Sequence, residues 1–236
     1  DPDDTDLYSE IHDDVRYHKG KMGRAVFAQT PGVFESAATL LGLQQELEAT
    51  ILETKRLSAL FEKIARWAIR YIDNVLDLGC DVIHISDDWG SRHGLLVSPE
   101  ALRRAVVPYE KMITDHVRQR GIPLSLHSDG NIWKAMDILL ELGFEVLHPV
   151  QRSVGMDCAE FKRLYGDRLC MYGGLDVQTT LGRGNLDAVR QEIAYTMQHA
   201  KPGGGLIFCT SHTPMANCSV DELVAAYDYA YEIAAY

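Results

Sequence analysis

From Ala25 onward, segments with the apolar pattern of a strand alternate with segments in which apolar residues recur at helical spacing. A short β-branched or apolar run gives way to a polar break, and a stretch with apolar residues at helical spacing follows. Six runs of this kind predict strands at residues 25–30, 81–88, 123–129, 145–151, 169–176 and 206–212. Strands that alternate with helices are typical of a parallel sheet with helical crossovers, in an open sheet or a closed barrel.

The helical stretches carry start and stop signals. One runs over residues 98–121, where Ser98 and Pro99 are typical of a helix start and Gly121 is typical of its end. Asn185 and Ser219 are the expected N-caps of two further helices. Their side-chain oxygens can accept a hydrogen bond from a backbone N–H group of the first turn.

Two features favour a (β/α)8 barrel of the TIM type over an open doubly wound sheet. No G-x-G-x-x-G fingerprint follows the first strand, and polar residues gather at the C-terminal ends of several strands, where barrel enzymes keep their chemistry. Only six strand–helix units are visible, whereas a complete barrel needs eight. We therefore expect a partial TIM-barrel catalytic domain over residues 25–236. Residues 1–24 lack an apolar period, and we expect them to form an acidic N-terminal loop or segment.

Composition narrows the classes of partner. With 34 acidic against 23 basic side chains and a formal net charge of −11, the surface would repel nucleic acid and anionic membranes. The five cysteines are scattered without a C-x-x-C pair, which argues against a disulfide framework and favours a reducing cytoplasm. No apolar run approaches the roughly 20 residues of a membrane span, and the acidic N-terminus is unlike a signal peptide. We expect a cytoplasmic protein.

The third predicted strand ends in a histidine and an aspartate two residues apart. In an extended segment such residues point to the same side, so His127 and Asp129 would both face the barrel mouth. An imidazole and a carboxylate can supply two ligands to a catalytic zinc, which needs one more protein ligand and an open position. The alternative is structural: Asp129 caps the following helix, and His127 is a hydrogen-bonded wall residue.

The last predicted strand offers the third ligand. His212 stands at its end, and Cys209 precedes it by three residues. In a regular strand Cys209 would lie on the opposite face from His212, so we rank His212 first.

The second strand ends in two adjacent carboxylates, Asp87 and Asp88, followed by Trp89. Neighbouring side chains of a strand face opposite ways. One carboxylate can therefore point into the mouth as a substrate acceptor or general base, while the other caps the next turn or pairs with Arg92. A purely structural role for the whole cluster is equally open.

Polar residues also end the fourth and fifth strands. His148 and Gln151 lie in the last part of the fourth predicted strand, although a lone histidine there is more often a satisfied core residue. Gly174 lets the backbone approach a ligand closely, and Asp176 follows it.

The order of these motifs resembles the uroporphyrinogen decarboxylase superfamily, which includes zinc-dependent, cobalamin-linked methyltransferases. The resemblance covers roughly residues 25–236 as the later six units of a (β/α)8 barrel, and the segments that carry it are DDWG, SPE, PYEKMI, LHSDGN, LGFEVLHPVQ, YGDRLCMYGGLDV, TSHTP and SVDEL. No single segment is specific, but their order and spacing together are.

In the methyltransferase branch, the resemblance implies a metal held by a His-x-Cys pair and a further cysteine. The matching positions here are His127, Asp129 and His212, so both cysteines are replaced. Harder carboxylate and imidazole ligands would make the metal a stronger Lewis acid. They also leave manganese, iron or no metal open.

The leading hypothesis is a methyltransferase that acts on a small methylated substrate, with zinc as metal and a separate corrinoid protein as methyl carrier. Its metal ligands would be His127, Asp129 and His212. The catalytic candidates are Asp88, His148 and Asp176, and the substrate-binding candidates are Asp87, Trp89, Trp133, Gln151 and Gly174.

Two alternatives remain. One is a cofactor-free decarboxylase in which Asp88 or Asp176 stabilises a protonated, pyrrole-like intermediate. This alternative ranks second because porphyrinogen carboxylates need arginines at the barrel mouth, and the strand ends offer mostly His, Asp and Gln. The other is a non-catalytic ligand-binding barrel or assembly subunit, since a six-unit sheet has edges that need a partner, a homo-oligomer included, or a missing segment.

Overall fold

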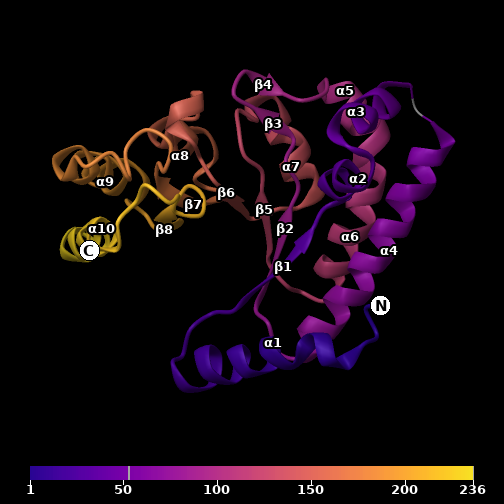
Figure 1. The fold of residues 1–236 in the computed structure, drawn as a ribbon, viewed down its shortest axis with the longest axis horizontal. Coiled ribbons are helices and arrows are strands. Elements are labelled where there is room, and N and C mark those ends of the chain that lie inside the picture. The colour runs from indigo at the N-terminus through magenta and orange to yellow at the C-terminus, as the bar shows by residue number, and fades with distance from the viewer. Residues whose placement is uncertain (53, 236) are drawn as a thin grey trace.

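A single parallel sheet organises the protein, as a computed structural model shows; the structure describes residues 1–52 and 54–235 (Figure 1). Its six strands are β1 (Phe27–Pro31), β2 (Val82–Ser86), β5 (Leu124–His127), β6 (Val146–His148), β7 (Cys170–Leu175) and β8 (Leu206–Thr210). They are hydrogen-bonded in the order β1-β2-β5-β6-β7-β8, and every neighbouring pair is parallel. Each strand overlaps one of the six predicted runs, so the predicted α/β fold is confirmed.

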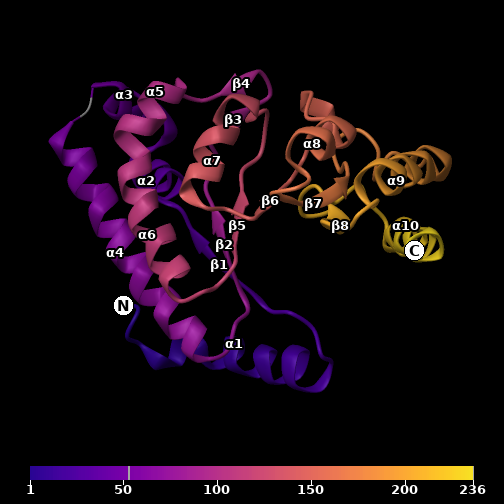
Figure 2. The same cartoon turned by 180° about the vertical axis from the view of Figure 1, so that it is seen from behind.

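Helices connect the strands and cover one face of the sheet. They are α1 (Ser9–Asp14), α2 (Val33–Leu41), α3 (Leu43–Leu52), α4 (Lys55–Asp77), α5 (Pro99–Ala101), α6 (Val107–Gln119), α7 (Met136–Leu142), α8 (Cys158–Tyr165), α9 (Leu186–Ala200) and α10 (Val220–Ile233). Helices α2, α4, α6 and α7 lie beside β1, β2 and β5, whereas α8, α9 and α10 lie beside β7 and β8 (Figure 2). Within the described ranges, no helix has the length and apolarity needed to cross a membrane.

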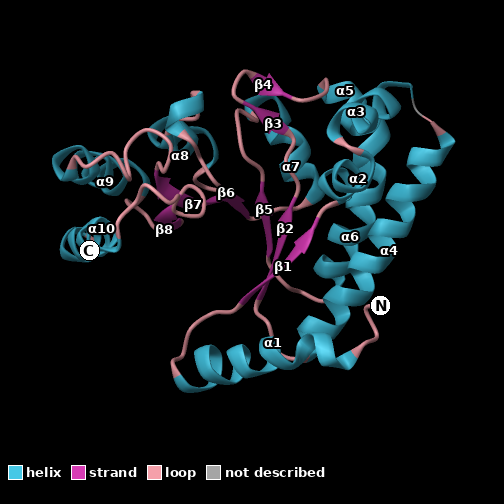
Figure 3. Ribbon diagram, in the orientation of Figure 1, coloured by secondary structure: helices cyan, strands magenta, loops and turns pink. Residues whose placement is uncertain are grey.

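Short elements complete the connections. The hairpin of β3 (Gly90–Ser91) and β4 (Gly94–Leu95) follows β2, and the sequence pattern did not predict it (Figure 3). Single turns of 3-10 helix are η1 (Thr5–Tyr8), η4 (Trp133–Ala135) and η5 (Arg152–Val154), and π-helical turns are η2 (Val15–Lys21) and η3 (Leu102–Val106). The predicted helix 98–121 is thus divided into α5, η3 and α6.

The predicted caps are confirmed. The side chain of Asn185 accepts a hydrogen bond from the backbone N–H of Ala188, and that of Ser219 accepts one from Glu222. Each cap satisfies one backbone donor that has no partner within its helix.

The acidic N-terminal segment is helical from Thr5 to Lys21, not the loop that we expected from its composition. The reason is a contact distant in sequence: the ring of Tyr8 stacks on Tyr71 of α4 at 5.9 Å. Lys19 further donates to the carbonyl oxygen of Gly79, just before β2. Because these partners are supplied by the folded domain, local composition did not reveal them.

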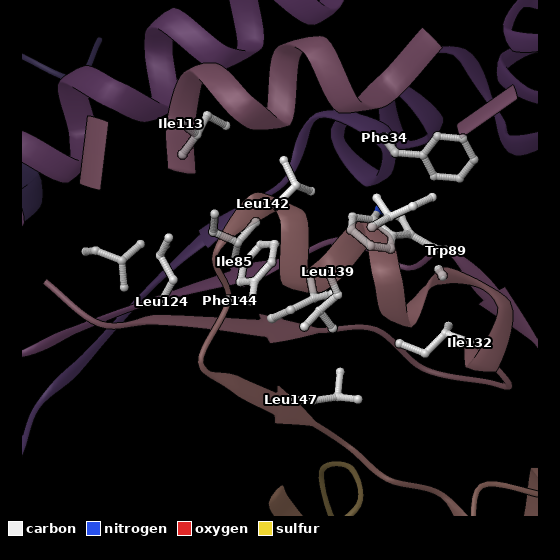
Figure 4. Packing of buried hydrophobic residues seen from close by; sticks show 14 of the residues in the cluster. Phe34, Ile85, Trp89, Ile113, Leu124, Ile132, Leu139, Leu142, Phe144 and Leu147 are labelled. Carbon is white, nitrogen blue, oxygen red and sulfur yellow. The ribbon is translucent and has the colours of Figure 1, made fainter. Parts of the chain in front are cut away.

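Successive side chains of a strand point to opposite faces of the sheet, so one face contributes to the hydrophobic core and the other to the cavity described below. Ile83 and Ile85 of β2, and Leu124 and Leu126 of β5, are fully buried and belong to the cluster packed against the helices. Figure 4 shows this layer, with Ile85 and Leu124 from the strands and Leu139 and Leu142 from α7. The alternate positions of the same strands carry polar side chains on the opposite face.

The sheet curls without closing in the described part of the chain. Strands β1 and β8 are its two edges and do not pair with each other. The curvature nevertheless brings Phe27 of β1 to within 5.8 Å, between ring centroids, of Tyr172 on β7. The concave face therefore encloses a space into which several strands project side chains.

Candidate active site on the concave face of the sheet

A cavity of about 540 Å³ occupies the concave face. Its lining residues come from strands β1, β2, β5, β6 and β7, from the start of α2 and from the segments after β2 and β8; they are Phe27, Gln29, Glu35, His84, Ser86, Asp88, His127, His148, Tyr172, His212 and Thr213. Most of the lining side chains are polar, and four of them are histidines.

Register brings the histidines of neighbouring strands side by side. In the parallel ladder, Ser86 of β2 is paired with His127 of β5, and His127 is paired with His148 of β6. Two residues earlier along β2, His84 lies on the same face as Ser86. The rings of His127 and His148 stack with centroids 5.0 Å apart, and His84 is 6.0 Å from His127.

Hydrogen bonds orient these rings. Nδ1 of His127 is 2.7 Å from Nδ1 of His148, whose Nε2 is 3.3 Å from the carbonyl oxygen of Thr210. Nδ1 of His84 is 2.7 Å from Oγ of Ser125. Each ring is thereby held by a partner from a different strand.

Burial keeps two of the rings uncharged near neutral pH. Together with the neighbouring histidines, it lowers the pKa of His84 to about 3 and that of His148 to about 4. A neutral imidazole has a lone pair on one nitrogen, so these rings can accept a hydrogen bond or ligate a metal.

Carboxylates stand beside His127. Its Nε2 lies 3.7 Å from Oδ1 of Asp88, and the same oxygen accepts a hydrogen bond from the backbone N–H of Asp129 at 2.8 Å. Oδ2 of Asp129 is 3.9 Å from Nε2 of His212, whereas its Oδ1 is buried without a hydrogen-bond partner. Burial raises the pKa of Asp129, and the nearby His127 opposes that change.

The structure brings the three predicted metal ligands close together. His127 and His212 have ring centroids 6.2 Å apart, and Asp129 lies within 4 Å of His212. Two donor sets lie closer still, with ligand atoms within 4.8 Å of one another: Asp88, His127 and Asp129 in one, and His84, His127 and His148 in the other. The orphaned Oδ1 of Asp129 and this oxygen and nitrogen donor set both fit a divalent cation.

The two adjacent carboxylates after β2 face opposite ways, as strand alternation predicts. Asp88 lines the cavity, but Asp87 is fully buried in the core. Its Oδ1 accepts from the backbone N–H of Glu35 at 2.7 Å, and its Oδ2 accepts from Nε1 of Trp89, which is also buried. Asp87 and Trp89, expected as substrate-binding residues, thus lie behind the cavity wall and hold α2 and the loop after β2.

The other predicted residues lie apart from this cavity. Gln151, Gly174 and Asp176 line a narrow neighbouring pocket between β7 and α9, with a volume of about 10 Å³. Oδ1 of Asp176 accepts two backbone hydrogen bonds from the turn that follows it. Trp133 stacks on Tyr165 and donates from Nε1 to the carbonyl oxygen of Gly155, so it packs on the outer layer.

Sequence patterns missed several lining residues. His84 and Tyr172 stand inside strands and not at their ends. The available signal was the alternation of side chains between the two faces of a strand, since each residue lies on the face that carries a predicted site residue or lines the cavity. Glu35 could not be found from the strand ends, because it belongs to helix α2. Its Oε2 accepts from Oγ of Ser86 at 2.9 Å, and burial raises its pKa.

Comparison with known proteins places this arrangement among related chains. The family model described as "Uroporphyrinogen decarboxylase (URO-D)" matches residues 4–233. The methylcobamide:CoM methyltransferase MtaA of Methanosarcina barkeri is 27% identical over 199 residues, which are 83% of this chain and 55% of that protein. The uroporphyrinogen decarboxylase of Syntrophotalea carbinolica is 26% identical over 157 residues, 65% of this chain and 42% of that protein.

Among solved structures, a methyltransferase from Methanosarcina mazei has a TM-score of 0.76 at 21% identity, covering 95% of this chain and 64% of the other. At that identity the match shows the fold alone. The chain spans 55% of the length of the curated methyltransferase that it matches.

Proposed function

The chain belongs to the uroporphyrinogen decarboxylase family, and from this premise we propose that it is a metal-dependent methyltransferase. It moves a methyl group between a small methylated substrate and a corrinoid protein. In support, the relative from Methanosarcina barkeri, which aligns with 83% of the chain, is named as a methyltransferase between methylcobamide and CoM.

The chemistry of the cavity lining carries this proposal. Four imidazoles and two carboxylates, those of Glu35 and Asp88, face the space, and the described lining residues include no lysine or arginine. A porphyrinogen that bears several carboxylates would meet negative charge there without a guanidinium partner. Nitrogen and oxygen donors instead suit a divalent cation and a small substrate.

The residues that would hold the metal are His127, Asp129 and His212, with Asp88 beside them. A bound metal would act there as a Lewis acid on the heteroatom that bears, or is about to receive, the methyl group.

The protein itself contributes walls and proton acceptors. Tyr172 and Phe27 lie 5.8 Å apart and offer an apolar surface for a methyl-bearing group. Glu35, whose pKa is raised by burial, can hold a proton closer to neutrality than an exposed glutamate. It can therefore protonate a departing amine or alkoxide on the cavity side.

The test combines metal analysis with a transfer assay. Purified protein is incubated with reduced corrinoid and a panel of methylated amines and methoxylated aromatics, and the visible spectrum of the corrinoid reports its methylation. We expect about one metal per chain and substrate-dependent methylation that is lost in His212→Ala. His93→Ala, on the exposed hairpin outside the cavity, is the matched control and should retain both.

Two results would redirect the assignment. Release of CO₂ from a porphyrinogen without any metal would support the decarboxylase alternative. A protein that holds no metal and turns over neither class of substrate would support the non-catalytic alternative.

A further inference from the structure

A hydrogen-bonded chain connects a backbone carbonyl to the edge of the carboxylate cluster. The carbonyl oxygen of Thr210 can only accept, so Nε2 of His148, 3.3 Å away, carries a proton. On a neutral ring this leaves the lone pair on Nδ1 of His148. Nδ1 of His127 lies 2.7 Å from Nδ1 of His148 and must therefore be the donor.

This chain determines which nitrogen of His127 is free. With its proton on Nδ1, a neutral His127 has its lone pair on Nε2, the atom 3.7 Å from Oδ1 of Asp88. Asp129 adds a buried oxygen that has no hydrogen-bond partner. A lone pair beside two carboxylates is an arrangement that a cation stabilises, and metal-binding histidines usually donate their second N–H to a fixed acceptor.

We propose that His148 and the Thr210 carbonyl are positioning groups that set the tautomer of His127, so that its Nε2 binds a divalent metal together with Asp88 and Asp129. The inference deepens the proposed function and rests on it only for the presence of a metal. It makes Asp88 a ligand and His148 a positioning residue, whereas both were expected to act on substrate. His212, 3.9 Å from Asp129, remains the further ligand of the proposed function.

The same distances argue against a metal shared by His84, His127 and His148. Two nitrogens bound to one tetrahedral zinc at about 2.1 Å are roughly 3.4 Å apart. The two Nδ1 atoms of His127 and His148 are only 2.7 Å apart, which is a hydrogen-bond distance. These two rings therefore bind each other, and His84 contacts them without being part of the chain.

The experiment measures metal affinity by competition with a chromophoric chelator, using Zn²⁺ and Co²⁺, on the purified protein and three variants. His148→Phe removes the acceptor, and we expect a loss of roughly 10–100-fold in affinity. His148→Gln restores an acceptor oxygen and should recover most of the affinity. His84→Phe, the matched control, should bind metal as the unchanged protein does.

A second measurement on the unchanged protein does not depend on the folding of any variant. Long-range ¹H–¹⁵N spectra report the tautomer of each histidine, and we expect His127 protonated on Nδ1 and His148 protonated on Nε2. The inference is wrong if His127 carries its proton on Nε2, if His148→Phe binds metal normally, or if His84→Phe loses affinity equally.

Failure of the proposed function would look different. Metal binding with the expected tautomers but without methyl transfer would leave this inference standing and overturn the activity. Methyl transfer by a protein whose metal affinity is insensitive to His148 would do the reverse.

Discussion

Two carboxylates buried behind the cavity make the stability of the protein depend on pH. Glu110 of α6 is fully buried; its Oε1 accepts from the backbone N–H of Val33 at 2.7 Å, and its Oε2 has no hydrogen-bond partner. Burial raises the pKa of Glu110 from 4.5 to about 7, and that of Asp87 is also raised. We predict that Glu110→Gln removes the part of this pH dependence that comes from Glu110, while the part from Asp87 remains.

The magnitude follows from linkage. Because the folded pKa of Glu110 lies above the unfolded value, its contribution to stability is fully present below pH 4.5 and is lost as the pH rises through about 7. A shift from 4.5 to about 7 corresponds to up to about 3 kcal/mol in the free energy of unfolding. Gln keeps the acceptor for Val33 and imitates the protonated Glu110 without titrating, whereas Asp87 still titrates in the variant.

The assay is urea unfolding at several pH values between 5 and 8, followed by circular dichroism. Relative to the unchanged protein, Glu110→Gln should gain stability progressively with pH, by up to about 3 kcal/mol at pH 8. Glu145→Gln replaces an exposed carboxylate before β6 and should leave the pH profile unchanged. Parallel stability profiles for Glu110→Gln and the unchanged protein would refute the reasoning.

Three further predictions concern packing and local geometry. Gly174→Ala should lower the melting temperature by several degrees, because Gly174 has φ +112° and a Cβ would lie 2.6 Å from Cγ2 of Thr196; unchanged thermal unfolding would contradict this. Ser219→Ala should cost about 1 kcal/mol in urea unfolding through loss of the α10 N-cap, and Ser219→Asp should restore it. Phe61→Ala, at a fully buried site of α4, should cost about 3–5 kcal/mol; a loss below 1 kcal/mol would show that the neighbouring core collapses into the space.

Much of the secondary structure could be predicted because its signals are local. Short β-branched or apolar runs marked all six strands of the parallel sheet, and side-chain oxygens before helical stretches marked the caps at Asn185 and Ser219. The C-terminal strand ends also identified Asp88, His127 and His212 as residues that a parallel sheet would bring near one another.

Other features depended on contacts between distant segments. The helical start of the chain follows from the packing of Tyr8 on Tyr71, and Glu35 reaches the cavity only because α2 packs beside β2. No local pattern distinguishes Asp87, buried in the core, from Asp88, which lines the cavity, until the direction of the strand end is known.

The sequence by itself determined the α/β class, the strands and the caps, because these depend on neighbours within a few residues. The tertiary structure decided which side chains meet, since strand register and sheet curvature place His127 beside His148 and next to Asp88. Register is set by packing over the whole sheet and not by neighbours in sequence. A slip of one residue in the register would turn each of these side chains to the other face of the sheet.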